Sequence, residues 1–449
     1  MGSAAGQPNY TKFQVIKKIK KGATKRETTK FVDIRGKVVG FNYYESLYSP
    51  MVTASFLEVD TGGTVGDQKD DFAGTLKDGL PIEGFEEVLV KVSTKYKALD
   101  WRGKKRRFVI TGSPYNVDSG TRQTAYFPMV SVNAIKSASK PIENIYPEAK
   151  ISEIVKKILK QAELPFEDEN IEETKNSMKV HGKNENALDT ILNLCHKSIP
   201  VKGDPGFFFY ENSQGYNFKS IHNMIKDGKD FLADATRSIT HRYIYEIGLK
   251  ANLDNDENDR HVLATPTVRR DQDVMNAIKN GQYNIRVCVR NLVTQEVTET
   301  IVNVYNNKET ITLGETIKQD LNNDQITENN TNYCRTYTFE LMPGVDNDDV
   351  SNEISNNPTL YLPKAIMRYS LIHAQLVNIV IPHNGRLTVG ECIRLDIENI
   401  TQDNKIEKEF NEHRSGDYLI LHLCHSFTPT NSFTSLTLAR DEYGFTKTE

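Results

Sequence analysis

The sequence is short of cysteine, of tryptophan, of net charge and of long apolar runs, and each shortage excludes a class of protein. Its five cysteines are scattered among 449 residues, and none forms a C-x-x-C pair. That pattern argues against a disulfide scaffold and predicts folding in a reducing cytoplasm. No apolar stretch reaches the roughly 18 residues that a membrane-spanning helix needs. The N-terminus, MGSAAGQPNY, has no apolar core, so neither a secretory signal nor membrane insertion is expected.

Charge and composition narrow the class further. The chain has 56 basic and 60 acidic side chains, for a formal net charge of -4. Such a balance provides no general attraction to nucleic acid or to an anionic membrane. Hydrophobic residues make up 38% and charged residues 26%, which predicts packed cores rather than disorder. The length is enough for roughly two to four domains.

The catalytic motifs that a sequence can show are also absent. There is no phosphate-binding G-x-x-x-x-G-K-[ST], no dinucleotide-binding G-x-G-x-x-G after a strand, no G-x-S-x-G and no H-E-x-x-H. Sixty acidic residues always leave a catalytic carboxylate pair conceivable, but nothing marks any particular pair. We therefore predict that the protein is not an enzyme, with no catalytic, cofactor-binding or metal-binding residues and no cofactor.

One cluster of metal-binding residue types tests that prediction. His422, Cys424 and His425 lie in "HLCH" within an alternating, strand-like stretch. On a strand, His422 and Cys424 point to one face and His425 to the other, so the three side chains do not share an ion without a bulge. We expect ordinary strand residues here.

Two charged stretches have similarly plain interpretations. Residues 254–259 resemble the start of a calcium loop, but the central glycine and the terminal glutamate are missing, which favours a solvated acidic loop. Residues 104–107, Lys-Lys-Arg-Arg, follow Trp101. A basic run beside an aromatic ring can bind a phosphate backbone, but a solvated hairpin turn is the favoured interpretation.

What is present is mainly β-patterned sequence. Residues 1–29 are polar and lysine-rich and are interpreted as an N-terminal arm. Residues 30–140 contain short period-2 stretches such as "TASFLEVD" and "EEVLVKV", separated by turn residues. Several short strands without a helical period predict a first antiparallel β-sandwich or barrel domain.

The hydrophobic pattern changes at residues 141–225. "ISEIVKKILKQA" and "ENALDTILNLC" each have one apolar helical face, and the hairpin "GFFFYENSQGYNFKSI" follows. The aromatic hairpin is either a stacking site for a sugar or base, or a buried structural hairpin. The buried interpretation is favoured, because only one Glu and one Lys stand at its edges and an apolar helix face precedes it. This region is predicted to be an α+β connector.

The last two regions are again β-rich. Residues 226–365 contain acidic, Asn-rich loops and strand-like runs, and are predicted to be an inserted β-rich domain. Residues 366–449 contain strands and a strong closing hairpin, "GDYLILHLCHSFTPTNSFTSLTLARDEYG". The overall prediction is a mainly β protein with α+β parts.

Three stretches, taken in order, resemble the baseplate hub proteins of contractile-tailed, T-even type bacteriophages. The first is "YSPMVTASFLEVDTGG" followed by "LPIEGFEEVLVKV", the second is the aromatic hairpin, and the third is "VIPHNGRLTVGECIRLDI" with the closing hairpin. They cover roughly residues 30–445. The sequence departs from the pattern at His383-Asn384, where the family often has a Gly after the Pro, and at residues 250–360, which match no known motif.

The resemblance implies a structural function. Hub proteins of this family are homotrimers with two tube-type antiparallel β-barrels per chain, here residues 30–140 and, completed by earlier strands, residues 366–449. Such a trimer joins the six-fold tail tube to the three-fold central spike and encloses a channel through which DNA passes in transit. The implied partners are the tail tube protein, the central spike protein and neighbouring baseplate wedge proteins, with a tape measure protein as a further partner. The implied location is the virion tail baseplate, after synthesis in the host cytoplasm.

Two other interpretations are kept. A hub-like module of a secretion-system or tailocin spike is expected to carry a repetitive C-terminal β-helix, and no such repeat is seen before Glu449. A carbohydrate-binding or carbohydrate-degrading tail protein predicts paired carboxylates and exposed aromatic residues in a groove, and the single tryptophan disfavours it.

Overall fold

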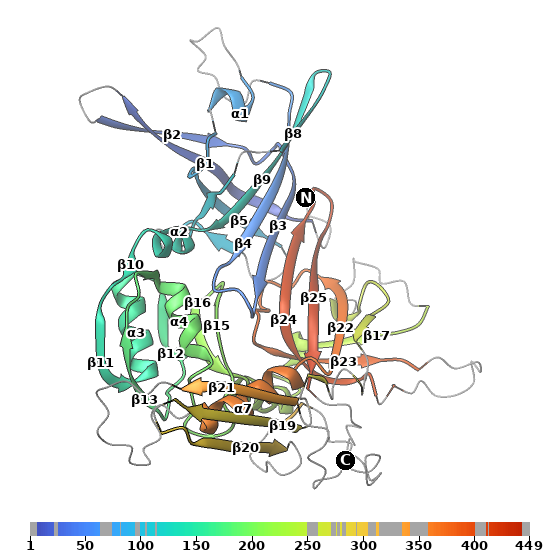
Figure 1. Cartoon of the computed structure of the whole chain (residues 1–449). Coiled ribbons are helices and arrows are strands. Elements are labelled where there is room, and N and C mark those ends of the chain that lie inside the picture. Colours follow the sequence, from blue (N-terminus) through green and yellow to red (C-terminus); the bar gives the residue numbers. More distant parts are fainter. Residues whose placement is uncertain are drawn as a thin grey trace, which may run out of the picture.

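The computed structural model of the chain describes most of the protein (Figure 1). The described residues are 7–21, 26–62, 74–80, 82–94, 99–103, 106–112, 115–248, 259–270, 275, 279–280, 284–292, 294–303, 311–313, 335–341, 358–399, 410–411 and 413–441. The protein is mainly β with few helices, as predicted. No helix in the described ranges is long and apolar enough to cross a membrane.

A fifteen-stranded sheet dominates the fold, with the order β18-β22-β25-β24-β3-β4-β9-β7-β5-β1-β2 and four strands attached beside this path. Among the described strands of this sheet, all neighbouring pairs are antiparallel except β17 with β23. The N-terminal strands are β1 (Asn9–Lys21), β2 (Arg26–Asp33), β3 (Val38–Ser46), β4 (Thr53–Asp60), β5 (Glu87–Ser93), β6 (Leu99–Trp101), β7 (Phe108–Ile110), β8 (Tyr115–Ser119) and β9 (Arg122–Ser131). The others are β17 (Arg242–Tyr245), β18 (Thr267–Arg270), β22 (Gln375–Pro382), β23 (Cys392–Ile397), β24 (Gly416–Phe427) and β25 (Ser432–Arg440).

The N-terminal part of this sheet curls around an aromatic core. Phe13 on β1 meets Phe41 on β3 with ring centroids 5.6 Å apart, and meets Phe56 on β4 at 5.2 Å. Strands β1 and β3 are several strands apart in the sheet order, so these contacts require strong curvature. Among the described strands, no hydrogen-bonded pairing closes the sheet into a barrel.

One strand pairing joins the two ends of the chain into a single sheet. β3 runs antiparallel to β24, with Tyr44 opposite Cys424. Phe41 stacks on Phe427 across this seam at 5.8 Å. Because nearly the whole chain separates these strands in sequence, their pairing couples the N-terminal and C-terminal parts directly. Strands β17 and β18, from the predicted inserted region, also pair with C-terminal strands β23 and β22.

The connector region lies beside this sheet (Figure 1). Helix α2 (Val132–Ala138) follows β9 and leads into the connector, whose helices are α3 (Ile151–Gln161) and α4 (Ala187–Cys195). Its strands are β10 (Pro141–Ile142), β11 (Ile145–Lys150), β12 (Phe166–Ile171), β13 (Ser177–His181), β14 (Glu185–Asn186), β15 (Phe207–Asn212) and β16 (Gly215–Ser220). The apolar faces of α3 and α4 share a hydrophobic core with β15 and β16, which is the packing that their helical periodicity predicts.

The remaining elements complete the C-terminal part. A three-stranded sheet contains β19 (Asn284–Asn291), β20 (Val297–Asn303) and β21 (Arg335–Leu341), and α7 (Pro358–Leu371) packs on it. Helix α5 (Ile221–Ala233) and the short η1 (Ile239–His241) follow the connector, and α1 (Leu76–Gly79) precedes β5. Much of the predicted insertion, like Cys334, lies outside the described residues.

The lysine-rich N-terminal region is more than an arm. Within it, Asn9–Lys21 forms β1 and pairs with both β2 and β5. Phe13 and Val15 alternate into the core with no exposed surface, while Lys17 and Lys18 make ion pairs with Glu86 and Glu87. The abundance of lysine masked a strand whose alternate positions are apolar. Residues 1–6 and 22–25 lie outside the described part of the chain.

Candidate functional site

The aromatic hairpin β15–β16 is the structural centre of the connector. Phe207, Phe209, Tyr216 and Phe218 are each at most 1% exposed. Phe207 stacks on Phe218 with ring centroids 4.7 Å apart, and Phe209 stacks on Tyr216 at 5.3 Å. The prediction that these rings are shielded from water is confirmed. They form the connector core with α3 and α4.

The opposite face of the same hairpin packs against the large sheet. Phe208 and Tyr210 are 7% and 2% exposed and belong to the main hydrophobic core, together with Met224 of α5. Successive residues of a strand point to opposite faces, so the hairpin is a wall shared by two cores. The sequence analysis did not predict this second role. Its signal is the unbroken aromatic run "FFFY", which has no polar residue for a solvated face.

A buried carboxylate links this wall to the N-terminal part of the sheet. Glu211, at 1% exposure, lies near the end of β15. It accepts hydrogen bonds from the Val52 amide at 3.0 Å, the Ser131 hydroxyl at 2.6 Å and the Asn133 side-chain amide at 2.7 Å. Val52 directly precedes β4, and Ser131 and Asn133 lie where β9 passes into α2. One connector residue therefore holds two segments that are distant from it in sequence.

A second buried carboxylate makes the reverse connection. Glu45 on β3 accepts hydrogen bonds from the Tyr43 hydroxyl at 2.6 Å, the Ser213 amide at 2.8 Å and the Val389 amide at 3.1 Å. Ser213 belongs to the turn of the aromatic hairpin, and Val389 precedes β23. Glu45 thus joins the N-terminal strands, the connector and the C-terminal strands at one point. We name Glu45 and Glu211 with their six donors the carboxylate junction.

Burial perturbs the protonation of both carboxylates. Loss of hydration raises the pKa of Glu45 to about 7, although its three donors partly oppose the shift. Burial likewise raises the pKa of Glu211, against the opposing effect of its own hydrogen bonds. Raised pKa values also occur at catalytic acids. Here, however, every hydrogen bond given above goes to a structural segment of the same chain, so the carboxylate junction is suited to holding parts together.

Glycine at position 390 lets the C-terminal part approach the hairpin closely. Gly390 has a φ of +85°, and a Cβ atom there would lie 2.3 Å from the Tyr210 hydroxyl oxygen. Its amide donates to the Ile420 carbonyl at 3.0 Å. The position therefore needs glycine both for its backbone conformation and for its contact.

A buried ion pair fastens the end of the sheet to α7. Arg368 and Asp441 have fully buried side chains, and their charged atoms are 2.9 Å apart. Asp441 also accepts a hydrogen bond from the Leu313 amide at 2.7 Å. The pair connects a helix on the three-stranded sheet with the residue that follows β25. Loss of one partner would leave a buried charge, which is strongly destabilising.

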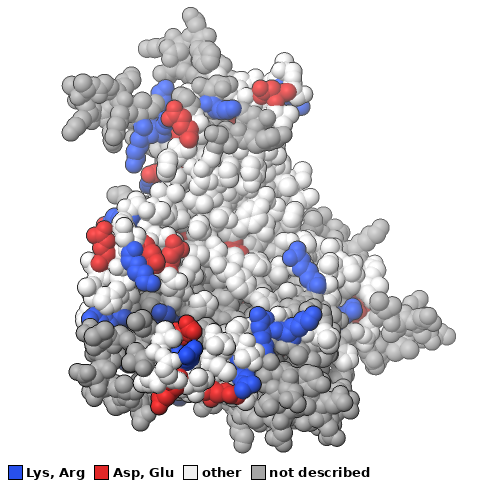
Figure 2. All heavy atoms as spheres, in the orientation of Figure 1, with Lys and Arg blue, Asp and Glu red and all other residues white. Residues whose placement is uncertain are grey.

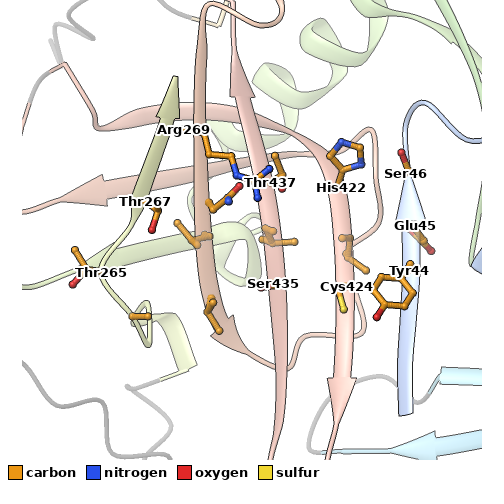
Figure 3. Close-up of a pocket in the computed structure, with 16 residues that line it drawn as sticks. Tyr44, Glu45, Ser46, Thr265, Thr267, Arg269, His422, Cys424, Ser435 and Thr437 are labelled. Carbon is orange, nitrogen blue, oxygen red and sulfur yellow. The ribbon is translucent and has the colours of Figure 1, made fainter. Parts of the chain in front are cut away.

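An open groove of about 480 Å³ crosses the seam between β3 and the C-terminal strands (Figure 3). Tyr44 and Ser46 come from β3, and His422 and Cys424 come from β24. Hydroxyl groups of the 265–267 segment and of β25, together with Arg269, supply most of the remaining polar lining. The groove is therefore a mostly uncharged, hydroxyl-rich surface with one exposed cation.

The three residues of the "HLCH" stretch separate as predicted. His422 and Cys424 line the groove, whereas His425 is 2% exposed and stacks on Tyr43 in the core at 5.8 Å. Within the described residues, no group of three or more His, Cys, Asp or Glu side chains is arranged to hold a metal ion. This stretch is part of the strand seam.

The basic run and the tryptophan also have structural surroundings. Trp101 is 2% exposed and stacks on Phe108 at 4.5 Å, so it lines no exposed carbohydrate groove. Arg107 pairs with Glu87, and Arg106 donates to the Gln214 carbonyl at 3.0 Å. Lys104 and Lys105, like residues 254–258 of the acidic loop, lie outside the described residues.

Charged side chains of both signs are spread over the molecule. In the view of Figure 2, they lie mainly toward the upper and lower parts, and the middle of this face is largely uncharged. This distribution agrees with the nearly balanced composition and shows no broad surface of one sign on that face.

Comparison with known proteins finds similarity to phage tail proteins. No family model matches the chain. A probable baseplate hub protein of Vibrio phage KVP40 is 21% identical over 440 residues, which cover 91% of this chain and 90% of that protein. Similar solved structures include a tail protein from Neisseria meningitidis MC58 (TM-score 0.48, 9% identity, 96% and 97% of the two chains) and a 43 kDa tail protein of prophage MuSo2 from Shewanella oneidensis (TM-score 0.47, 8% identity, 96% and 98%).

The sequence similarity extends over nearly the full length of both chains. Similarity of this extent is expected when two proteins share a whole architecture, but not when they share a single motif. This chain is therefore a relative of the baseplate hub proteins of contractile phage tails, a structural component of the tail baseplate.

Proposed function

We propose that the protein acts as a homotrimeric symmetry adaptor that joins the six-fold tail tube to the three-fold central spike. The observation that carries the proposal is the similarity to a probable baseplate hub protein over nine tenths of both chains. The adaptor function, the trimer and the individual partners are what we add to that observation.

Symmetry explains why such a chain would contain two related β units. A tube with six-fold symmetry cannot bond evenly to three copies of one unit, because half of its contacts would go unmade. Three chains with two units each present six, and closed rotational symmetry is the usual form of oligomers. We propose that the curled sheet of residues 30–140, and the C-terminal strands of residues 366–449 completed by earlier strands, are these two tube-type barrel units.

The interior contacts favour a rigid adaptor. The β3–β24 ladder fixes one β unit against the other, and the carboxylate junction fixes both against the connector. Buried hydrogen-bonded polar networks favour one arrangement of the parts that they join. An adaptor that transmits force between tube and spike needs such fixed relative positions.

The remaining assignments follow from the adaptor function. We propose the division into an N-terminal region (1–29), whose strand β1 joins the first barrel, the rest of that barrel (30–140), a connector (141–225), an inserted β-rich domain (226–365) and a second barrel (366–449). The trimer would enclose a channel for DNA in transit, and wedge and tape measure proteins would contact its periphery. The protein itself would perform no catalysis. This would be contradicted if the pure protein cleaved peptidoglycan and a point substitution abolished that cleavage.

Reconstitution tests the adaptor function. The purified protein is mixed with the tail tube protein and the spike protein of the same phage, and the complexes are examined by electron microscopy and native mass spectrometry. We expect three copies per complex, a six-fold contact with the tube and a three-fold contact with the spike. Failure to bind either partner, or a ring of another symmetry, would refute the proposal.

A further inference from the structure

The loop before β5 presents an unusual aromatic side chain. Phe85 is 77% exposed, the largest exposure given for any large apolar residue in the described part of the chain, and its φ is +67°. A bulky residue rarely adopts this left-handed conformation, because its Cβ atom then crowds the following carbonyl oxygen at a cost in free energy. The ring recovers none of that cost by burial within its own chain. Strain of this kind persists only where the surroundings enforce it, and it gathers at functional positions.

The surroundings of Phe85 do enforce the conformation. The Phe85 amide donates to the Ile110 carbonyl at 2.8 Å. The carboxylate of Glu86, 4% exposed, accepts from the amides of Glu83 at 3.1 Å and Gly84 at 2.9 Å. Lys17 adds an ion pair to Glu86 at 3.3 Å. Residues 82–87, "IEGFEE", thus build a rigid knob that holds an aromatic ring in solvent, and pre-organised aromatic anchors are characteristic of protein interfaces.

The same chain carries a complementary hollow. The groove at the β3–β24 seam has a volume of about 480 Å³ and includes Tyr44 and apolar side chains of the sheet. Its exposed charge is cationic, because Arg269 is exposed and Glu45 is directed to its internal donors. The side chain of Glu83, beside Phe85, is 83% exposed, and its carboxylate shares the Lys17 ammonium, 3.7 Å away, with the buried Glu86. Two carboxylates around one ammonium leave the knob with a net negative charge, opposite to that of Arg269.

We propose that the Phe85 knob of one copy inserts into the seam groove of the next copy, with Glu83 approaching Arg269. The proposal rests on the proposed homotrimer and identifies a contact within it. Knob and groove lie on different elements, the loop before β5 and the strands of the seam. In the proposed three-fold ring the contact repeats head-to-tail from copy to copy, and such contacts close into rings when the rotation allows.

Self-association of the purified full-length protein tests the contact. Sedimentation velocity over a concentration series is measured for the wild type, for Phe85→Ala and for Phe31→Ala, a control ring that is 61% exposed on β2. We expect Phe85→Ala to weaken association at least about 30-fold, which is the usual threshold for an interface anchor. Phe31→Ala should associate like the wild type. Unchanged circular dichroism and thermal transitions confirm that each variant is folded.

Charge reversal tests the pairing of the two surfaces. Glu83→Arg and Arg269→Glu should each weaken association, and the double variant should recover most of the wild-type affinity. The pairing is overturned if Phe85→Ala associates like the wild type, or if the double variant associates no more tightly than the single variants. It is also overturned if the wild type stays monomeric at every concentration. Binding to the tube and spike proteins is measured in parallel. If the protein binds both partners but does not form the knob–groove contact, the contact is refuted while the proposed adaptor function is not.

Discussion

Removal of the Glu211 carboxylate should loosen the connector from the large sheet. In Glu211→Ala, the amide of Val52, the hydroxyl of Ser131 and the side-chain amide of Asn133 lose their acceptor. A buried donor left without a partner costs roughly 1–3 kcal/mol. The hydroxyl can rotate toward another acceptor, and the variant no longer buries a carboxylate. We therefore expect a net loss of about 3 kcal/mol, less than the sum of the three penalties.

Urea denaturation followed by circular dichroism measures the loss of stability. The matched control is Glu167→Ala, an exposed glutamate on β12 of the same connector, which should change stability by no more than about 0.5 kcal/mol. Hydrogen exchange adds a local readout, because the Val52 amide should exchange faster in Glu211→Ala. If Glu211→Ala unfolds at the same urea concentration as the control and the Val52 amide stays protected, the carboxylate junction does not hold the two cores together.

Three further predictions address the cores, the close approach at the hairpin and the pH dependence. Phe218→Ala should cost roughly 3–5 kcal/mol in urea unfolding, because the ring has no exposed surface; unchanged stability with loss of a bound ligand would instead favour a stacking site. Gly390→Ala should cost about 3 kcal/mol from its φ of +85° and the contact with Tyr210, whereas Gly36→Ala, with no atom within 4 Å, should unfold nearly like the wild type in thermal scans. Burial raises the pKa of Glu45 to about 7 from an ordinary 4.5, so its protonated form is favoured by folding. This group should therefore contribute about 3 kcal/mol of stability below pH 4.5, and that contribution should be lost as the pH rises through 7. The Glu45→Gln variant should lack this pH dependence. If its urea midpoints change with pH in the same way as those of the wild type, the prediction is wrong.

Local patterns in the sequence were sufficient to predict many of the individual elements. The period-2 stretches became strands, and the apolar faces of residues 151–162 and 185–195 became buried faces of α3 and α4. The burial of Phe207 and Phe218 also followed from local sequence, because an apolar helix face precedes a hairpin with few charges. Side-chain periodicity reports which face of an element is buried, and this information is local.

Only the tertiary structure showed which buried faces meet. The pairing of β3 with β24, the reach of Glu211 to Val52 and the second buried face of the aromatic hairpin all join segments that are distant in sequence. The strained Phe85 was missed for the same reason, and so were the partners of the lysines that masked the N-terminal strand. Lys17 and Lys18 find their acidic partners, and Phe85 its conformation, only through contacts with β5 and β7. Periodicity shows that a face is buried but not against what, because the partner is chosen by the free energy of the whole packed chain.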